Sequence, residues 1–550
     1  MARSGPYLSR LVSRLRMAVS GAELASAVPS TSSGSVGLCD NRSPPEHSQV
    51  TFATSAAAAA TPDTAVIDYL QKALTGWIPV PAHSSAATNK AEPKEERGES
   101  EPTRPAVAVS LHRKQPIAVP QVSRRSLDER SRALVKKLAV ASSGSSRLLR
   151  TEELCHHLLE YPETRDIVVQ EGVIGLLLSL AASTADQGLK SQIRVCLALA
   201  GYISPPDARG IRVLSIDGGG TRGVMAIEIL EELERHLEGK KLYEVFDLFV
   251  GVSTGAILGA MLFAKRFSLD KCKELYREFS LKLFGTASRF SGVRGLLRAH
   301  SYYDSDSWQQ YLQHHLGLNL MIDSNRVSKT PRICILSSVI DKKRQLGPFA
   351  FRNYNLPAGQ NSMYSGSCKH PTWLALQASS AAPMYLSEVL IDNYIHQDGG
   401  VILNNPTSIG LHESGLLWPN VPLQCVLSLG NGRIVQLANN QEDNSNTSLQ
   451  EKINLFVESA TNTELHHMVL NDALSSGVYY RLNPYMSEAF TLDTGDTEKL
   501  DQMQQDARMY IRRNELKLRA VAKCLLQKRS WSQKLTDCLR HKSARFLKTY

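Results

Sequence analysis

A serine flanked by glycines, at the junction of two apolar segments, constrains the fold of this chain more than any other feature. Residues 243–250 are rich in β-forming side chains and predict a strand, whereas residues 256–263 predict a helix. Between them lies Gly251-Val-Ser253-Thr-Gly255. Small residues let the backbone turn sharply there and expose the serine hydroxyl at the edge of a sheet. The start of the following helix then favours negative charge beside that hydroxyl.

The same segment admits a membrane-spanning alternative. Residues 248–264 carry no charge, and Gly255 and Gly259 form a GxxxG pair. The run is, however, shorter than the about 20 apolar residues that a span requires. Its glycines are better explained by a sharp turn and by the close packing of a helix on a sheet. We therefore predict a buried strand and helix.

A second constellation lies upstream, where a predicted strand at Ile211–Ile216 is followed by a glycine-rich loop and then by an amphipathic helix at Val224–Leu237. The three successive glycines leave backbone N–H groups free to hold an anion, either a phosphate or the oxyanion of an acyl-transfer intermediate. The loop consists of Asp217, Gly218, Gly219, Gly220, Thr221, Arg222 and Gly223.

Taken alone, this loop also fits two kinds of nucleotide-binding protein. Gly218, Gly220 and Gly223 match a dinucleotide fingerprint, with Glu238 about 20 residues beyond the first glycine. Asp-Gly-Gly-Gly-Thr is also similar to the phosphate loop of actin-like sugar kinases. Neither fold requires a serine elbow one helix later, and a kinase needs a second glycine-rich loop, for which Ser428–Gly432 is a poor candidate.

A third constellation, Asp398-Gly399-Gly400, ends the hydrophobic stretch Glu388–His396. An aspartate on such a turn most often only stabilises the turn. A carboxylate that follows one strand can nevertheless lie beside a serine that follows another strand of the same sheet.

Together the three segments resemble the patatin-like phospholipase family, in which a glycine-rich loop, a serine elbow and an Asp-Gly-Gly turn occur in this order. Ala378–Pro383 is also similar to the segment that precedes the aspartate in that family, and the resemblance covers about Gly210 to Asn405. It implies a three-layer α/β domain with a mostly parallel sheet. A long polar N-terminal region precedes this domain. In this layout the chain resembles the gamma type of animal calcium-independent phospholipases A2.

The resemblance implies a catalytic dyad, with Ser253 as nucleophile and Asp398 as base. Gly218, Gly219 and Gly220 would supply oxyanion N–H groups. The supporting motif positions are Asp217, Thr221, Arg222, Gly223, Gly251, Gly255, Gly399 and Gly400. A carboxylate near its reference pKa of about 4 is a weak base toward an alcohol. Burial is therefore expected to raise the pKa of Asp398, and the loop to carry much of the rate enhancement.

A Ser-Asp-His triad is the rival mechanism, with the histidine after the acid. His412, His466 and His467 lie downstream of Asp398, but none stands in an evident loop after a strand. His396 would share a strand face with Asp398, where it is better explained as a packed side chain. We therefore expect a dyad.

The expected reaction is hydrolysis of glycerophospholipid acyl esters to a fatty acid and a lysophospholipid. No cofactor or metal is expected, because the nine cysteines form no CxxC pair and the Asp304-x-Asp306 pair lacks the rest of a calcium loop. The alternatives are a phosphate-binding protein that uses the glycine-rich loop and a helical scaffold without catalysis.

The N-terminal part predicts a targeting leader and linker over residues 1–125. Met1–Ser20 is basic and amphipathic, as in a mitochondrial presequence, and the residues after it are rich in Ser, Ala, Thr and Pro. A disordered basic terminus is the alternative. We expect an intracellular, membrane-associated protein, mitochondrial or else of the endoplasmic reticulum or peroxisome. The Ser-Lys-Leu peroxisomal signal is not present at Leu547–Tyr550.

Three further regions are predicted. Residues 126–205 are predicted to form short helices similar to armadillo units. Residues 206–490 are predicted to form the catalytic domain, and residues 491–550 a basic amphipathic helical region. Residues 511–550 hold twelve Lys or Arg side chains against two acidic ones, a net charge of +10 that equals that of the whole chain. This suits an anionic phospholipid membrane surface rather than nucleic acid. The alternative is a solvated last helix whose apolar side packs on the core.

Overall fold

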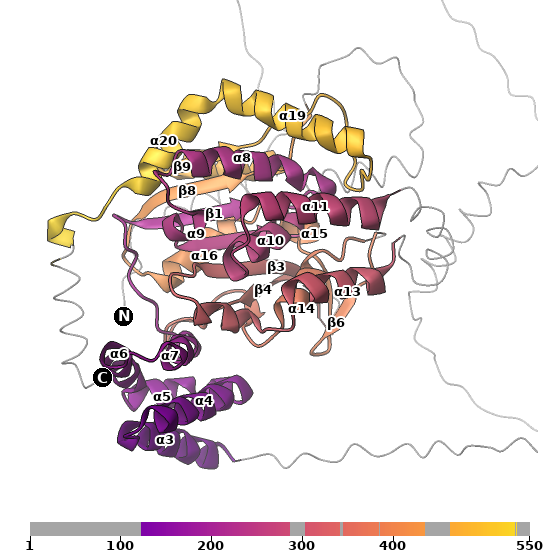
Figure 1. The fold of residues 1–550 in the computed structure, drawn as a ribbon. Coiled ribbons are helices and arrows are strands. Elements are labelled where there is room, and N and C mark those ends of the chain that lie inside the picture. Colours follow the sequence, from indigo (N-terminus) through magenta and orange to yellow (C-terminus); the bar gives the residue numbers. More distant parts are fainter. Residues whose placement is uncertain are drawn as a thin grey trace, which may run out of the picture. The chain divides into compact units, whose positions relative to one another are not determined.

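The computed structural model describes residues 123–285, 303–341, 345–383, 385–434, 463–533 and 535 (Figure 1). All of them belong to one compact unit. The predicted presequence and almost all of the predicted linker lie outside these residues, as does the last part of the basic region. Those assignments stay predictions.

The first described region is helical, as predicted for residues 126–205. Its leucine-rich helix faces form a core of their own around buried Leu154, Leu177 and Leu189. The elements are α3 (Arg124–Val140), α4 (Gly144–Glu160), η2 (Pro162–Thr164), α5 (Arg165–Gln170), α6 (Val173–Ser183) and α7 (Gln187–Leu199). Similarity to armadillo repeats stays a prediction, because helices alone do not establish a repeat.

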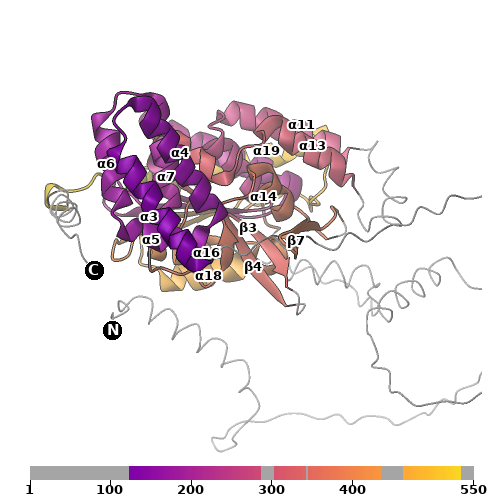
Figure 2. The same cartoon turned by 90° about the horizontal axis from the view of Figure 1, so that it is seen from below.

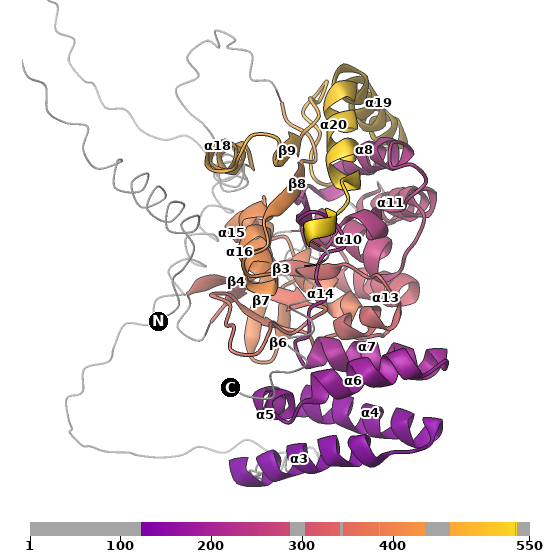
Figure 3. The ribbon, with the colours of Figure 1, turned by 90° about the vertical axis from the view of Figure 1, so that its left-hand side faces the viewer.

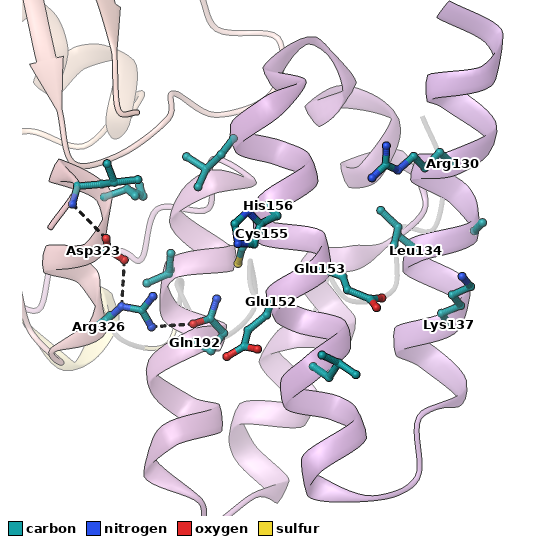
Figure 4. A pocket seen from close by; sticks show the side chains of 16 residues that line it. Arg130, Leu134, Lys137, Glu152, Glu153, Cys155, His156, Gln192, Asp323 and Arg326 are labelled. Carbon is teal, nitrogen blue, oxygen red and sulfur yellow. Dashed lines mark hydrogen bonds and ion pairs between the residues drawn. The ribbon is translucent and has the colours of Figure 1, made fainter. Parts of the chain in front are cut away.

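The helical region contacts the sheet domain through η5 (Met321–Arg326). Ile322 of η5 is buried in the helical core, and the Arg326 guanidinium donates to the Gln192 side chain at 2.7 Å. A groove of about 800 Å³ lies between α3, α4, α7 and η5 (Figure 4). None of the predicted site residues lines this groove.

The second region is built on one mixed sheet with the order β5-β4-β3-β2-β1-β8-β9. The five strands from β3 to β9 in this order are parallel, whereas β4 and β7 run antiparallel to β3. The strands are β1 (Ile211–Ile216), β2 (Leu248–Val252), β3 (Arg332–Ile340), β4 (Leu346–Arg352), β5 (Ser365–Ser367), β6 (Val389–Ile391), β7 (Tyr394–Asp398), β8 (Leu423–Leu429) and β9 (Tyr479–Leu482).

Helices cover both faces of this sheet (Figure 3). One face packs on α8, α10 and α14, and the other packs on α16 around Ile409 and Leu417. The three-layer α/β fold with a mostly parallel sheet is therefore confirmed. The helices are η3 (Gly220–Gly223), α8 (Val224–Arg235), α9 (Leu242–Val245), α10 (Thr254–Gly259), η4 (Ala260–Ala264, a π-helix), α11 (Leu269–Phe284), α13 (Ser305–Leu316), α14 (Thr372–Ser379), α15 (Gly400–Leu403), α16 (Thr407–Leu417) and α18 (Thr463–Ala473).

Two local expectations are corrected. The strand expected at residues 243–250 is shorter, because α9 occupies its first part and β2 begins at Leu248. The stretch Glu388–His396 is not one strand but the hairpin β6–β7, whose turn residues Asp392 and Asn393 have φ of 48° and 68°. Asn and Asp tolerate this left-handed conformation, which two-residue hairpin turns require.

The apolar segment 248–264 forms β2, α10 and η4, all buried within the sheet domain. In the described ranges, no single helix is both long and apolar enough to cross a bilayer. One bent pair of helices, Pro162–Gln170 with Val173–Ser183, meets the criteria for a membrane span, by length and composition only.

The C-terminal helices α19 (Thr497–Arg513) and α20 (Glu515–Leu526) are part of the sheet domain rather than a separate region. Leu518, Val521 and Leu525 of α20 are buried in the same core as α8. For α20 the structure therefore shows the alternative, in which the apolar side of the helix packs on the core, and a role of residues 511–550 at a membrane stays a prediction. Trp531 beyond α20 is 85% exposed.

Candidate active site

Two strands that run toward each other build the centre of the candidate site. Parallel β2 and antiparallel β7 pair with the same edge of β3. Val252, the last residue of β2, pairs with Leu336, and Asp398, the last residue of β7, pairs with Ser337. Because Leu336 and Ser337 are consecutive, the ends of β2 and β7 meet. This brings Ser253 and Asp398 together although 145 residues separate them in the sequence.

Ser253 occupies a strained turn between β2 and α10. Its φ of 52° and ψ of −121° lie in a region that residues with a side chain rarely adopt. The Ser253 N–H donates to the Ser379 hydroxyl oxygen at 2.9 Å, and that hydroxyl donates to the Leu336 carbonyl at 2.5 Å. A Cβ on Gly255 would lie 2.2 Å from the Ile216 carbonyl oxygen, so this position requires glycine. The predicted elbow is thus present, and Gly251 is equally crowded.

Asp398 is buried and directed at the serine. The Gly400 N–H donates to its Oδ1 at 2.7 Å, and hydrogen bonding from the neighbouring Ser253 side chain lowers the pKa of its carboxyl. Burial raises the pKa of Asp398 to about 6, although these two hydrogen bonds favour the charged form. A Cβ on Gly399 would lie 2.5 Å from the Leu336 carbonyl oxygen, which explains the glycine after the aspartate.

The glycine-rich loop lies beside Ser253. A Cβ on Gly218 would lie 3.3 Å from the Ser253 Cβ. The Gly218 N–H already donates to the Asn404 carbonyl at 3.3 Å. The N–H groups of Gly219 and Gly220 donate to no other backbone group in the described part of the chain. Of the three predicted oxyanion donors, Gly219 and Gly220 are thus the uncommitted ones.

Neighbouring side chains hold the loop through its carbonyl groups. The Thr254 hydroxyl donates to the Gly220 carbonyl at 2.6 Å, and the Tyr276 hydroxyl donates to the same oxygen. Gly220 has a φ of 57°, and a Cβ there would lie 2.0 Å from the Leu492 carbonyl oxygen. The loop is therefore fixed before any ligand binds.

The remaining motif positions also serve this loop. The Thr221 N–H donates to the Leu492 carbonyl at 2.8 Å, and the Arg222 Nε donates to the Gly219 carbonyl at 3.2 Å. A Cβ on Gly223 would lie 2.3 Å from the Thr254 side chain.

Asp217, the first loop residue, has a partner that the sequence analysis missed. The Arg481 guanidinium on β9 donates to the Asp217 Oδ2 at 2.6 Å and to the Glu464 carboxylate at 3.0 Å. Both Arg481 and Asp217 are buried. The Asn431 amide also donates to the Asp217 carbonyl at 2.6 Å. Arg481 is the one charged residue of β9, which is a sequence signal for a buried ion pair. The sequence does not identify the acidic partner.

The histidines are engaged elsewhere. His396 shares a strand face with Asp398, as predicted, but its Nδ1 lies 2.8 Å from the Ser337 hydroxyl and burial lowers its pKa to about 4. His412 contacts Ser362, and His467 lies 3.2 Å from the Tyr479 hydroxyl. No hydrogen bond between these three imidazoles and Asp398 occurs in the structure.

Within the described ranges, no group of three His, Cys, Asp or Glu side chains could hold a metal ion. The Asp304 carboxylate caps α13 by accepting from the N–H groups of Asp306 and Ser307 at 3.0 and 3.3 Å. The Asp304-x-Asp306 pair is thus a helix cap. The loop residues that fit a nucleotide fingerprint lie instead against Ser253, a neighbour that nucleotide binding does not require.

Residues 214–411 match the family model described as patatin-like phospholipase. Calcium-independent phospholipase A2-gamma of Mus musculus is 41% identical over 422 residues, 77% of this chain and 54% of that protein. Its namesake of Homo sapiens is 42% identical over 422 residues, 77% of this chain and 53% of that protein. Phospholipase A I of Arabidopsis thaliana is 30% identical over 276 residues, 41% of this chain and 21% of that protein.

The chain spans about half the length of the gamma-type relatives from mouse and human. The family match covers the end of β1, the glycine-rich loop, the elbow and Asp398, and the last three lie at one end of the sheet. Through residues 214–411, the sheet domain of this chain is thus similar to the patatin-like phospholipase family.

Proposed function

We propose that this chain is a serine acyl hydrolase that cleaves fatty-acyl esters of glycerophospholipids. The observation that carries the proposal is the contact between the Ser253 hydroxyl and the buried Asp398 carboxylate at a strained turn. Relatives that match the chain over this domain are phospholipases by name. The products are a free fatty acid and a lysophospholipid.

Acylation begins when the Ser253 oxygen attacks the ester carbonyl carbon while Asp398 takes the hydroxyl proton. The carbonyl oxygen becomes an oxyanion that accepts hydrogen bonds from the Gly219 and Gly220 N–H groups. When the tetrahedral intermediate collapses, the C–O bond to glycerol breaks and Asp398 returns the proton to the leaving oxygen. The lysophospholipid departs, and the acyl group stays on Ser253.

Deacylation repeats the same steps with water. Asp398 takes a proton from a water molecule that attacks the acyl-Ser253 ester, and the same two N–H groups hold the second oxyanion. The intermediate collapses to the free fatty acid, and Asp398 returns its proton to Ser253. One residue thus serves as base and then as acid in each half of the cycle.

Burial makes this chemistry feasible for a carboxylate. A pKa of about 6 makes Asp398 a stronger base than an exposed aspartate while leaving it mostly ionised at neutral pH. The contacts that fix Gly220 keep the oxyanion donors in place before the reaction, and one such donor contributes roughly 10²–10³ in rate.

The substrate class implies work at a phospholipid surface, and the chemistry requires no calcium. The attack, the proton transfers and the oxyanion contacts all use groups of the chain itself. Chelation of calcium should therefore leave the rate unchanged.

Labelling by a serine-reactive fluorophosphonate tests the nucleophile. The full chain should be labelled, and Ser253→Ala should abolish the labelling. Ser183→Ala, at an exposed serine of the helical region, is the matched control and should label like the wild type. Equal labelling of wild type and Ser253→Ala would refute the proposal.

Phosphatidylcholine labelled differently in its two acyl chains tests the reaction. The wild type should release labelled fatty acid and lysophosphatidylcholine at the same rate with and without a calcium chelator. The label in the released fatty acid also identifies the ester position that is cleaved. Release of other products, or none, would contradict the proposed activity.

A further inference from the structure

A row of apolar side chains crosses the outer end of the sheet. The strand registers pair Leu390 of β6 with Ile395 of β7, Ile395 with Ile340 of β3, and Ile340 with Leu346 of β4. Directly paired residues point to the same face of a sheet. These four side chains, which we call the outer row, are therefore neighbours on one face.

The outer row is exposed where a sheet face is usually covered. Leu390 is 73% exposed, Leu346 49% and Ile395 39%. On the same face, α16 covers the inner strands, and Leu403 of α15 packs against that part of the core. The covering helices thus leave the outer row open.

The adjacent row on the opposite face contrasts with it. Val389 pairs with His396, and His396 pairs with Val339, and all three residues are buried. At these two adjacent rows, the exposed apolar side chains therefore lie on one face of the hairpin and the buried ones on the other. Contiguous exposed apolar side chains mark an interaction surface.

The outer row lies at the same end of the sheet as Ser253. The last residue of β2, Val252, pairs with Leu336, whereas Ile340 lies four residues further along β3. At about 3.3 Å per residue, the strand carries Ile340 roughly 13 Å beyond the level of Val252. Figure 2 shows β3, β4 and β7 together from below. A surface bound to the outer row therefore adjoins the site.

The chemistry around the row favours a lipid surface. Tyr394, which pairs with Ile391 and lies on the opposite face of the same hairpin, is 41% exposed, and aromatic side chains are enriched at membrane interfaces. In the sequence, the three residues that link Asp341 to Gln345 are Lys342, Lys343 and Arg344, which lie outside the described residues. The acidic residues Asp341, Glu388 and Asp392 also flank the row in sequence, so the exposed aliphatic side chains rather than a net charge favour a bilayer surface.

We propose that the outer row is the surface by which this chain docks onto a phospholipid bilayer, an inference that rests on the proposed phospholipase function. The aliphatic side chains enter the boundary between headgroups and acyl chains. A phospholipid then reaches Ser253 from the adjoining membrane rather than from water. This surface replaces α20, whose apolar face is buried.

The test compares Leu390→Gln/Ile395→Gln with the wild type, both as full chains. Sedimentation with vesicles of phosphatidylcholine and phosphatidylserine should show roughly tenfold or weaker binding for the double variant, because two aliphatic side chains no longer leave water. Hydrolysis of vesicle phospholipid should fall in parallel. Hydrolysis of a monomeric, water-soluble short-chain ester should stay unchanged, because the site itself is intact.

Two controls replace apolar residues elsewhere that are at least as exposed as Leu390 and Ile395. Val140→Gln at the end of α3 (81% exposed) and Leu516→Gln on α20 (84% exposed) should bind vesicles like the wild type. Wild-type binding by the double variant would overturn the proposal. A wild-type dimer without lipid that the double variant loses would also overturn it, by assigning the row to a second copy of the chain.

Failure of the docking surface and failure of the proposed function give different results. If the wild type hydrolyses neither substrate, the proposed phospholipase function is refuted. Vesicle sedimentation still tests whether the outer row binds a bilayer. If wild type and double variant hydrolyse both substrates equally, only the row fails. If the double variant loses ester hydrolysis because it misfolds, the single variant Leu390→Trp tests whether this position enters the bilayer. Brominated lipids should quench its added fluorescence, and unquenched fluorescence would overturn the proposal.

Discussion

Two buried carboxylates at the same end of the sheet have opposite surroundings. Asp217 follows β1 and forms an ion pair with Arg481 at 2.6 Å. Asp398 ends β7, and its described partners are the Ser253 hydroxyl and the Gly400 N–H rather than a cation. Burial raises the pKa of both carboxyls, but Arg481 offsets part of this rise at Asp217.

This difference separates a structural carboxylate from a reactive one. Burial raises the pKa of both carboxyls to about 6, but Asp217 has a cationic partner that fixes the loop that it begins. A buried aspartate without a cation is destabilised in its charged form, and a proton from a neighbouring hydroxyl relieves that cost. The same residue type, two strands apart, therefore anchors the oxyanion loop in one place and accepts a proton in the other.

The largest expected effect is on catalysis. Ser253→Ala and Asp398→Asn should each lower kcat/KM for phospholipid hydrolysis by roughly 10⁴-fold or more, because one removes the nucleophile and the other its base. Steady-state kinetics of folded variants, checked by circular dichroism, measure this. Wild-type activity in Asp398→Asn would remove the dyad and, with it, the contrast between the two carboxylates.

Removing the Arg481 cation should destabilise the fold, because it removes the partner of the structural carboxylate Asp217. Arg481→Met leaves Asp217 as a buried, unpaired charge and should lower the free energy of unfolding by about 3–5 kcal/mol. Adding Asp217→Asn to Arg481→Met should recover much of that loss, because no buried charge is then left. Thermal and urea unfolding measure both variants, and equal stability of Arg481→Met and wild type would show that the pair is not structural.

Asp398→Asn should stabilise the fold while it destroys activity. The folded pKa of about 6 exceeds the unfolded value of about 3.9, so the wild type loses stability as the pH rises from about 4 to 6. The asparagine never ionises and escapes this loss. The free energy of unfolding of the variant should therefore rise relative to that of the wild type as the pH increases. The difference between the two proteins should be about 2–3 kcal/mol larger at pH 7.5 than at pH 4. A gain independent of pH would indicate that Asp398 is not the titrating group.

The pH dependence of the reaction should report the same carboxyl. Because Asp398 must be ionised to accept a proton, kcat/KM should fall about tenfold per pH unit below pH 6. Rates measured on a water-soluble ester avoid effects of pH on vesicles. A profile that stays flat to pH 4 would mean that the working base keeps an unshifted pKa.

The smallest effect is expected at His396. His396→Gln removes the contact with the Ser337 hydroxyl and should lower the free energy of unfolding by about 1 kcal/mol. It should leave kcat/KM nearly unchanged. A loss comparable to that of Asp398→Asn would favour the triad over the dyad.

Much of the local structure could be predicted from the sequence. Gly251–Gly255 between apolar segments predicted the elbow, and the structure gives the reason, because a Cβ on Gly255 would lie only 2.2 Å from the Ile216 carbonyl oxygen. The order of the three motifs predicted the fold and the residues that meet around Ser253. The division of Glu388–His396 into two strands was missed, since a hairpin depends on the two positive φ angles of its turn.

Apart from the Ser253–Asp398 pair, which the family resemblance implied, contacts between distant segments could not be predicted. The sequence by itself determined which residues bear the chemistry, because turns, glycine contacts and strand patterns depend on neighbours along the chain. Only the tertiary structure decided that β2 and β7 meet on one edge of β3, that Arg481 pairs with Asp217, and that α20 is buried. Strand register and helix packing depend on the whole core, which no local pattern specifies.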